Sequence, residues 1–340
     1  MTHNFKRTLG KSDIHVSAMG MGCWAIGGPF TGFGGMELGW GKVDDKESIN
    51  ALLTAHEKGI NFFDTADVYG TGHSERLIAK AFADRRNEVV IATKFGMVFN
   101  AQEKDTNDLD ASPQYIRKAL EASLKRLNTD YVDLYQLHIK DYDNEKAIET
   151  RDTLEDLVKE GKIRGYGWST DDYERALIFS QGQNCTAIQH QFNIFVGNKK
   201  ILRLCEENDL ASINRGPLGM GLLTGKFSEK VDLPANDVRI MMDTMQDPYY
   251  MYFKEGKPLP ELLKKLEIVR EILCSGGRTL AQGALAWIWG KSLITIPIPG
   301  FKTVKQATEN ADALNYGPLT ISQMRQIEEL MHPEKEVAGM

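Results

Sequence analysis

The chain has 340 residues, of which 42% are hydrophobic and 26% charged, and its formal net charge at pH 7 is −6. These values are typical of a globular protein, and a chain of this length can bury a sizeable core. The negative net charge gives nucleic acid no general attraction, and the sequence has no basic stripe interleaved with aromatic residues. We therefore expect no nucleic-acid partner.

The four cysteines are widely spaced and form neither a C-x-x-C pair nor a cluster with histidines. This pattern favours reduced thiols over a disulfide framework or a zinc site, so we expect no metal. The first ten residues lack an apolar signal core, and no apolar run is long enough to span a bilayer. We expect a soluble, cytoplasmic protein without a membrane partner, for which a homo-oligomer is compatible with the sequence.

At the amino terminus the pattern predicts a hairpin from Phe5–Leu9 and Ile14–Val16, joined by a Lys-Ser-Asp turn. A first apolar strand is expected to follow over Val16–Gly22. If the remaining strands close into a barrel, such a hairpin can plug one of its ends.

Gly20, Gly22 and Ala25 match the dinucleotide-binding pattern G-x-G-x-x-A. The next stretch holds seven glycines from Gly27 to Gly41 and is too rich in glycine to begin a helix. We interpret the match as accidental and predict a flexible loop here.

From Asp45 onward, helical and strand patterns alternate. Asp45 is expected to cap a helix that stops at Gly59, and Ser112 followed by proline is expected to begin another. Three predicted strands end at Asp64, Lys94 and His138, and the later ones cover Ile163–Ser169, Thr186–His190, Leu210–Asn214 and Leu293–Pro297.

Eight strands, all but the first preceded by a helix, predict a (β/α)8 TIM barrel, which we expect to form a single domain over residues 1–340. An open doubly wound sheet is the alternative fold. The barrel is favoured because ionisable or amide residues end strand after strand, whereas an open sheet gathers its site at one switch point. A long loop is expected after the seventh strand, from about Arg215 to Pro258. Its aromatic- and Met-rich segment 239–253 is predicted to be a lid or a subunit interface.

Asp64, Tyr69, Lys94 and His138 are the candidate catalytic residues, because three consecutive strand ends bring them to one mouth of the barrel. A phenol with a pKa of about 10 is a poor acid near neutrality unless a neighbouring cation stabilises its phenolate. Lys94 can be that cation, Asp64 can hold it charged, and His138 can hydrogen-bond a substrate oxygen. Singly, each residue is more often a packing, capping or solvated side chain.

The sequence resembles the aldo-keto reductase superfamily, in its bacterial and archaeal NADP-dependent type, over nearly its whole length. The motifs that carry the resemblance are R-T-L-G-K-S-D-I-H-V-S, D-T-A-D-V-Y-G-T-G-H-S-E, A-T-K, S-L-K-R-L-N-T-D-Y-V-D-L-Y-Q-L-H, G-K-I-R-G-Y-G-W-S-T, P-L-G-M-G-L-L-T-G-K and P-G-F-K-T-V-K-Q-A-T-E-N. The resemblance implies a (β/α)8 barrel that transfers hydride from a nicotinamide cofactor to a carbonyl. It also implies that Tyr69 is the proton donor and that Asp64, Lys94 and His138 complete a tetrad.

The resemblance further implies that NADP(H) is the cofactor. Thr170 stands where the family more often has Asn, and Arg215 where many relatives place an aromatic residue under the nicotinamide. Lys302, at the start of a helix, suits the adenosine 2′-phosphate. The cofactor-binding residues expected from the resemblance are Gly22, Cys23, Trp24, Asp64, Ser169, Thr170, Gln189, Arg215, Gly216, Pro217, Leu218, Gly219, Gly221, Lys226, Gly300, Lys302, Gln306, Glu309 and Asn310.

Together these features predict an NADP(H)-dependent oxidoreductase that reduces a small aldehyde or ketone to an alcohol. One alternative is an NADPH-binding regulatory subunit of the same fold with little turnover. Another is an isomerase or aldolase that uses Lys94 as a Schiff base. The intact tetrad favours the reductase, and the identity of the carbonyl substrate is left open.

Overall fold

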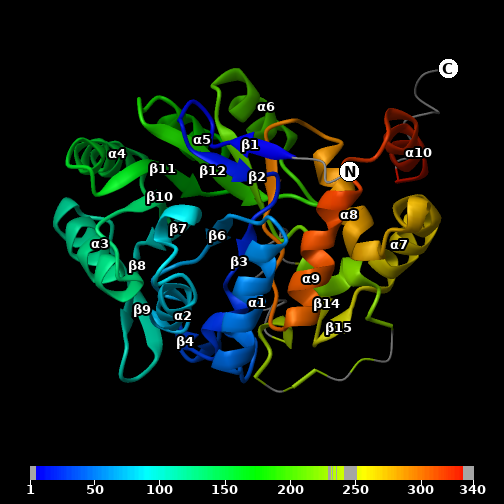
Figure 1. Cartoon of the computed structure of the whole chain (residues 1–340), viewed down its shortest axis with the longest axis horizontal. Helices are drawn as coiled ribbons and strands as arrows, with labels where there is room; N and C mark the ends of the chain where they lie inside the picture. The colour runs from blue at the N-terminus through cyan, green and yellow to red at the C-terminus, as the bar shows by residue number, and fades with distance from the viewer. Residues whose placement is uncertain (1–4, 229–230, 232, 235, 241–250, 332–340) are drawn as a thin grey trace.

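The structure is a computed structural model and describes residues 5–228, 231, 233–234, 236–240 and 251–331. Its central sheet has eight parallel strands: β3 (Met21–Gly22), β6 (Phe62–Asp64), β7 (Val90–Phe95), β10 (Val132–Leu137), β11 (Ile163–Ser169), β12 (Cys185–Gln191), β13 (Ala211–Arg215) and β16 (Thr295–Pro297). Each strand pairs with the next in this order, and a parallel bridge between Gly22 and Gly300 joins the two ends of the sheet. The predicted (β/α)8 barrel is therefore confirmed (Figure 1).

Helices surround these strands, and their apolar faces are buried against the barrel (Figure 1). They are α1 (Asp45–Glu57), α2 (His73–Ala81), α3 (Pro113–Leu127), α4 (Asn144–Lys159), α5 (Tyr173–Ser180), α6 (Lys199–Glu207), α7 (Pro260–Leu273), α8 (Leu280–Trp289), α9 (Val304–Asp312) and α10 (Ile321–Met331). Short 3-10 turns occur at η1 (Ala25–Gly27), η2 (Arg86–Glu88), η6 (Ser275–Gly277) and η7 (Ala313–Asn315).

The helix caps follow the sequence signals with one correction. Ser112 caps α3 as predicted, its hydroxyl accepting a hydrogen bond from the backbone N–H of Tyr115. The cap of α1 is Asp44 instead of Asp45, because Asp44 has the extended backbone and its carboxylate accepts from the N–H of Glu47.

The predicted amino-terminal hairpin is present as β1 (Lys6–Thr8) and β2 (His15–Ser17), which pair antiparallel. Leu9, Ile14 and Val16 are buried in one cluster with inward-facing strand residues such as Leu134 and Ile213. The hairpin thus closes one end of the barrel. It also takes Val16 away from the first barrel strand, so that strand is shorter than predicted and begins at Met21.

A four-stranded accessory sheet lies outside the barrel, at the opposite end from the hairpin (Figure 1). It consists of β4 (Thr31–Gly32), β5 (Met36–Glu37), β8 (Met97–Asn100) and β9 (Asp105–Leu109). The prediction of a flexible loop over Gly27–Gly41 is therefore wrong for this stretch. The cause is long-range pairing, because Thr31 lies beside Asp105 of β9, a partner that local sequence does not reveal.

The long connection after β13 is present as predicted. It contains η3 (Gly219–Thr224), η4 (Val238–Ile240), β14 (Phe253–Lys254) and β15 (Lys257–Pro258), and α7 follows. The lid or interface prediction for segment 239–253 falls mostly on residues 241–250, which lie outside the described residues.

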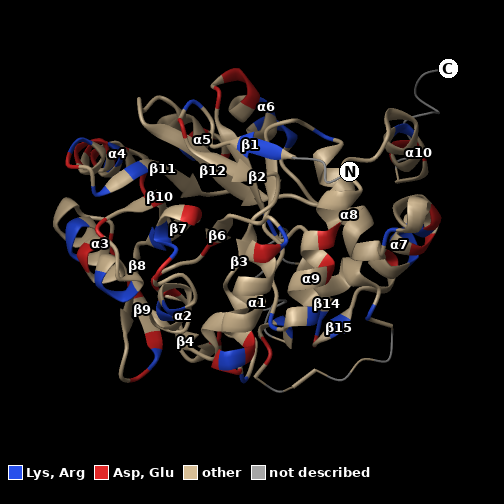
Figure 2. Cartoon of the chain, viewed as in Figure 1, with Lys and Arg blue, Asp and Glu red and all other residues tan. Residues whose placement is uncertain are grey.

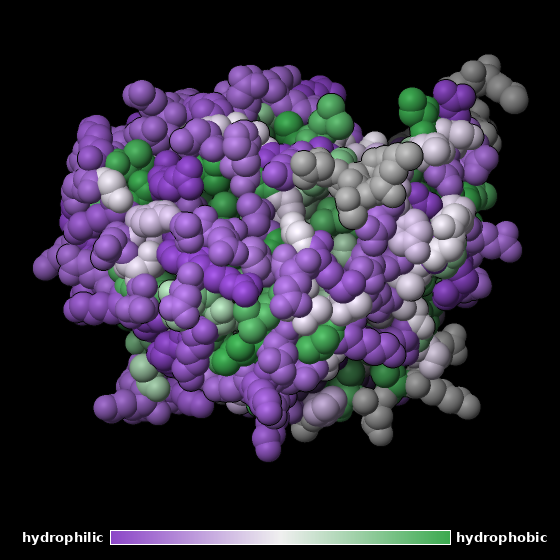
Figure 3. Space-filling model, in the orientation of Figure 1, coloured by the Kyte–Doolittle hydropathy of each residue, from purple (hydrophilic) through white to green (hydrophobic). Residues whose placement is uncertain are grey.

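Acidic and basic side chains are interspersed over the helices in the view of Figure 2, and polar residues cover most of that face in Figure 3. This face therefore presents no extended surface of a single charge sign. Among the residues that the structure describes, no helix is both long and apolar enough to cross a membrane.

A buried carboxylate joins three barrel strands near the hairpin end. Asp133 of β10 is 1% exposed and accepts hydrogen bonds from Arg86 at 2.8 Å, Arg164 at 2.8 Å and the backbone N–H of Ile91 at 2.9 Å. Arg164 belongs to β11 and Ile91 to β7, so one side chain holds the middle strand to both neighbours.

We predict that Asp133→Ala lowers the free energy of unfolding by about 2–4 kcal/mol, because two arginines and a buried N–H lose their shared acceptor. Urea denaturation followed by circular dichroism measures this change. The matched control is Asp13→Ala, whose carboxylate also pairs with Arg164 but is 90% exposed. It should shift the free energy by less than about 0.5 kcal/mol. Equal effects of the two substitutions would contradict the prediction.

Candidate active site

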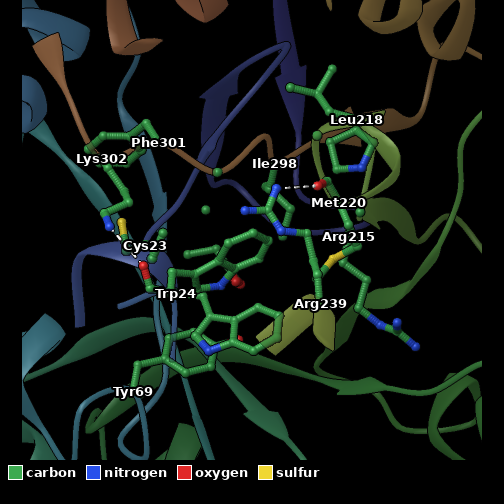
Figure 4. Close-up of a pocket in the computed structure, with 18 of the residues that line it drawn as sticks. Cys23, Trp24, Tyr69, Arg215, Leu218, Met220, Arg239, Ile298, Phe301 and Lys302 are labelled. Atoms are coloured by element: carbon green, nitrogen blue, oxygen red, sulfur yellow. Dashed lines mark hydrogen bonds between the residues drawn. The ribbon is translucent and has the colours of Figure 1, made fainter. Parts of the chain in front are cut away.

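A cavity of about 540 Å³ opens at the end of the barrel where the strands finish. The predicted site residues line it, with the exceptions of Lys94, Thr170 and Gly219. Residues from the accessory sheet, from the connection after β13 and from α9 complete its wall. Figure 4 shows part of this lining, with Trp24, Tyr69 and Arg239 among the labelled residues. The position agrees with the rule that sites of (β/α)8 barrels lie at the carboxyl ends of the strands.

A buried ion pair lies at the base of this cavity. The Nζ atom of Lys94 is 2.5 Å from Oδ1 of Asp64 and donates a second hydrogen bond to the carbonyl oxygen of Thr65 at 2.8 Å. Both side chains are almost fully buried. Burial lowers the pKa of Lys94, and the carboxylate of Asp64 opposes this shift. The carboxylate of Asp64 thus compensates a lysine charge that water cannot reach.

The second oxygen of Asp64 accepts from two amides, Gln136 at 3.0 Å and Gln189 at 2.7 Å. Gln189 also donates to the amide oxygen of Gln136 at 3.2 Å, and its own oxygen faces Ser169 at 3.5 Å. Gln189 therefore orients the carboxylate as well as lining the cavity. Sequence analysis missed Gln136, although strand alternation places it on the same face as His138, two residues later.

Tyr69 and His138 lie beside the ion pair. The Nζ atom of Lys94 is 3.5 Å from the phenol oxygen of Tyr69, and the rings of Tyr69 and His138 meet edge to face at 5.8 Å. Burial, followed by the charges of Lys94 and Arg215, lowers the pKa of His138 well below 6.5. The imidazole is consequently neutral at physiological pH, and its buried Nδ1 atom has no hydrogen-bond partner among the described residues.

The turn after β6 fixes Tyr69. Gly70 has φ of +57°, and a Cβ atom there would lie 1.9 Å from the carbonyl oxygen of Gly27. Only glycine fits so close an approach, which explains the glycine that follows the tyrosine in D-V-Y-G.

Of the two predicted cofactor-binding residues Arg215 and Thr170, only Arg215 lines the cavity. Arg215 lines the cavity, pairs with Asp171 and donates to Gln191 at 2.9 Å, so it is a fixed group and not a solvated loop residue. Thr170 is buried outside the cavity lining, where its hydroxyl accepts from the backbone N–H of Asp172. The structure therefore does not bring Thr170 to the predicted cofactor contacts.

The glycine-rich turn after β13 exposes backbone to the cavity. Gly216 and Gly221 both have positive φ and line the cavity, whereas Gly219 is buried within the turn. At Gly216 a Cβ atom would lie 2.1 Å from the amide nitrogen of Gln191, so this position requires glycine.

Three cationic side chains also line the cavity. Lys226 and Arg239 belong to the connection after β13, and Lys302 lies just before α9. Lys302 donates to the carbonyl oxygens of Trp40 at 2.8 Å and Lys42 at 3.0 Å, and it lies across the cavity from Arg239 in Figure 4. Burial lowers the pKa of Lys226 and of Lys302.

Arg239 was not predicted as a site residue. It is 6% exposed, pairs with Asp237 at 2.6 Å, and its guanidinium lies 5.1 Å from the ring centre of Trp40. Asp237 is only two residues away, but no local motif indicates that Arg239 reaches Trp40, far away in the sequence, and the cavity. Among the described residues no group of three or more His, Cys, Asp or Glu side chains could hold a metal ion.

Comparison with known proteins agrees with this geometry. Residues 31–332 match the Aldo/keto reductase family. The chain is 33% identical over 299 residues to the aldo-keto reductase yakc [NADP(+)] of Schizosaccharomyces pombe, with 84% of each chain covered. It is 31% identical over 323 residues to an NADH-specific methylglyoxal reductase of Escherichia coli, with 91% of this chain and 93% of that protein covered. The solved glycerol dehydrogenase AKR11B4 of Gluconobacter oxydans superposes with a TM-score of 0.80 at 29% identity, covering 98% of this chain and 96% of that one. This protein therefore belongs to the aldo/keto reductase family of oxidoreductases.

Proposed function

We propose that this protein is an NADP(H)-dependent reductase that converts an aldehyde or ketone to an alcohol, with Tyr69 as the proton donor. The observation that carries the proposal is the position of Lys94, which is held by Asp64 and lies 3.5 Å from the phenol oxygen of Tyr69. A buried cation at this distance stabilises the phenolate that proton donation leaves behind.

The residues around the cavity fit the proposed cofactor. Ser169 and Gln189 offer a hydroxyl and an amide close to the tetrad, and Lys226, Arg239 and Lys302 supply positive charge for phosphates. At Gly300 a Cβ atom would meet nothing nearer than 3.9 Å, so bare backbone faces open space at the cavity wall. When bound, NADPH supplies the hydride.

The chain's own side chains handle the proton. Tyr69 is placed to protonate the substrate oxygen as negative charge develops on it, and Lys94 stabilises the resulting phenolate. His138, being neutral, can donate a hydrogen bond to the same oxygen without carrying a charge. Asp64, fixed by Gln136 and Gln189, keeps Lys94 charged and in place.

The relatives do not settle cofactor or substrate. The Schizosaccharomyces pombe protein is named for NADP(+) and the Escherichia coli protein for NADH, at nearly equal identity to this chain. The Escherichia coli protein is named for methylglyoxal and the Gluconobacter oxydans protein for glycerol, which are different substrates. The cofactor and the substrate of this protein must therefore be determined by its own residues. In this proposal Lys302 binds the 2′-phosphate of the cofactor.

We predict that Tyr69→Phe lowers kcat for carbonyl reduction by at least about 100-fold, because the phenol gives up its proton only in the transition state. The dissociation constant of NADPH should change by less than about threefold. NADPH consumption with a panel of carbonyl compounds and fluorescence titration measure the two quantities. Tyr173→Phe, on α5 and away from the cavity lining, is the matched control. NADPH binding without turnover of any carbonyl by the wild type would instead support the regulatory-subunit alternative.

Because the pKa of His138 is lowered, we predict that the pH profile of kcat/KM shows no titration of this histidine near neutral pH. Because the imidazole is neutral above a pKa well below 6.5, kcat/KM should stay flat between about pH 6 and pH 8. In His138→Gln, kcat/KM should be lower than in the wild type but equally independent of pH over this range. A decline centred near pH 6.5 in the wild type that disappears in His138→Gln, but persists in the control His73→Gln, would show that His138 titrates and contradict its neutral role.

Lys302→Met is predicted to weaken NADPH binding about 10- to 100-fold more than NADH binding, because only NADPH carries the 2′-phosphate. Both cofactors can lose some affinity, since Lys302 also anchors Trp40 and Lys42. Titrations of both cofactors at two salt concentrations measure the difference, and salt should weaken NADPH binding more. Lys305→Met is the control, because Lys305 is exposed in α9, which begins just after Lys302. Equal weakening of both cofactors would exclude Lys302 as the phosphate reader.

A further inference from the structure

Two arginines that line the cavity are each paired with a buried aspartate. Arg215 pairs with Asp171, and Arg239 pairs with Asp237 at 2.6 Å. Both arginines are labelled in Figure 4. The two pairs have the same chemistry but face different groups of the site, so each can serve as a reference for the other.

Asp171 holds Arg215 at the point where three barrel strands end. It follows β11 by two residues, and its side chain is 2% exposed. One carboxylate oxygen binds the guanidinium of Arg215, and the other accepts the backbone N–H of Gln191 at 2.7 Å. Gln191 ends β12, Arg215 ends β13, and the two are neighbours in the paired strands. Asp171 does not line the cavity, so it acts on a ligand without touching it.

Further hydrogen bonds fix the guanidinium of Arg215. It donates to the amide oxygen of Gln191 at 2.9 Å, and the amide nitrogen of Gln191 donates to the phenol oxygen of Tyr252 at 2.8 Å. Asn193 donates to the same phenol oxygen at 2.7 Å and to the carbonyl oxygen of Gly216 at 2.8 Å. Gln191, Asn193 and Tyr252 are all buried. The positive charge of Arg215 therefore has a defined position in the cavity wall.

The charge of Arg215 acts on the tetrad. Burial lowers the pKa of His138, and the charges of Lys94 and Arg215 lower it further. Burial also lowers the pKa of Lys94, where Asp64 opposes the shift and Arg215 adds to it. A ring that lies at the tetrad is therefore exposed to the charge of Arg215, less the part that Asp171 offsets.

Arg239 acts on another part of the cavity. Burial and then the charge of Arg239 lower the pKa of Lys226. Burial lowers the pKa of Lys302 as well, where Asp237 opposes the shift and Arg239 adds to it. The Asp237–Arg239 pair is thus associated with the lysines that are proposed to bind phosphates.

The oxidised and reduced forms of a nicotinamide cofactor differ in charge at the ring. The ring is neutral in NADPH and carries one positive charge in NADP+, whereas the phosphates are the same in both forms. A cation beside the ring therefore disfavours NADP+ relative to NADPH, and an anion has the opposite effect. Charge near the phosphates changes the affinity for both forms alike.

We propose that Asp171 is a positioning residue that sets the relative affinity of the site for NADP+ and NADPH, by holding and offsetting the charge of Arg215 beside the nicotinamide ring. The proposal rests on the proposed reductase function, because Tyr69 defines where the reacting ring lies. Each of the two ion pairs there, Lys94 with Asp64 and Arg215 with Asp171, is neutral as a whole. The site therefore accepts the positive ring of NADP+ as well as the neutral ring of NADPH.

Equilibrium titrations test the proposal without turnover, by fluorescence for NADPH and by calorimetry for NADP+. Asp171→Asn keeps the size of the side chain but removes its charge, so the ratio of the Kd of NADP+ to that of NADPH should rise at least about fivefold. Arg215→Met should lower the same ratio at least about fivefold. Asp171→Glu keeps the charge and should leave the ratio within about threefold of the wild type. A substitution that only loosens the fold would weaken both cofactors by the same factor and leave the ratio unchanged.

Asp237→Asn is the matched control, because it removes the carboxylate of the second pair in the same cavity. It should change both affinities by the same factor and leave the ratio within about twofold of the wild type. An unchanged ratio in Asp171→Asn or in Arg215→Met, or an equal rise in Asp237→Asn, would overturn the proposal while leaving the reductase function intact. Failure of the wild type to bind either cofactor would overturn the proposed function and this proposal with it.

Discussion

The site depends on the ion pair between Lys94 and Asp64. An ammonium buried this completely is unfavourable unless opposite charge and hydrogen bonds replace its water, and Asp64 together with the carbonyl oxygen of Thr65 provides them. The remaining oxygen of Asp64 is bound by two glutamines from other strands. Four barrel strands, β6, β7, β10 and β12, therefore meet around one carboxylate, and the position of Tyr69 follows from the lysine that this carboxylate holds.

The barrel explains how residues distant in the sequence reach this point. Gln136 lies beside Lys94 in the paired strands, and Asp64 lies beside Ala92. Because parallel strands finish at the same end of the barrel, small offsets in register are enough to bring their last side chains together. The hairpin closes the other end with apolar residues, so the polar network is confined to one layer near the mouth.

Much of this arrangement can be read from the sequence, because its signals are local. Each apolar run that leads to Asp64, Lys94 or His138 is visible by itself, as is the cap at Ser112, although β7 ends one residue after Lys94 and β10 one residue before His138. The accessory sheet could not be predicted, since β4 and β5 are too short to show alternation and β4 finds its partner at Asp105 of β9. Arg239 was missed because the contact that brings it to the cavity wall is with Trp40, which is distant in the sequence. Gln136 is different. The strand alternation that directs His138 to the site also directs Gln136 there, but the sequence does not show that its hydrogen-bond partner is Asp64.

The contacts of Trp40 illustrate how stability is distributed over the molecule. Residues 39 and 40 are joined to the connection after β13 by a bridge from Trp40 to Asp237 and one hydrogen bond from Val238 to Gly39, and to the start of α9 by Lys302. These bonds close very long chain segments, and Trp40 also packs against the apolar cluster of that connection, which contains Met220, Val238 and Phe253. Trp40 therefore ties Arg239 and Lys302, which belong to segments far apart in the chain, into one wall of the cavity.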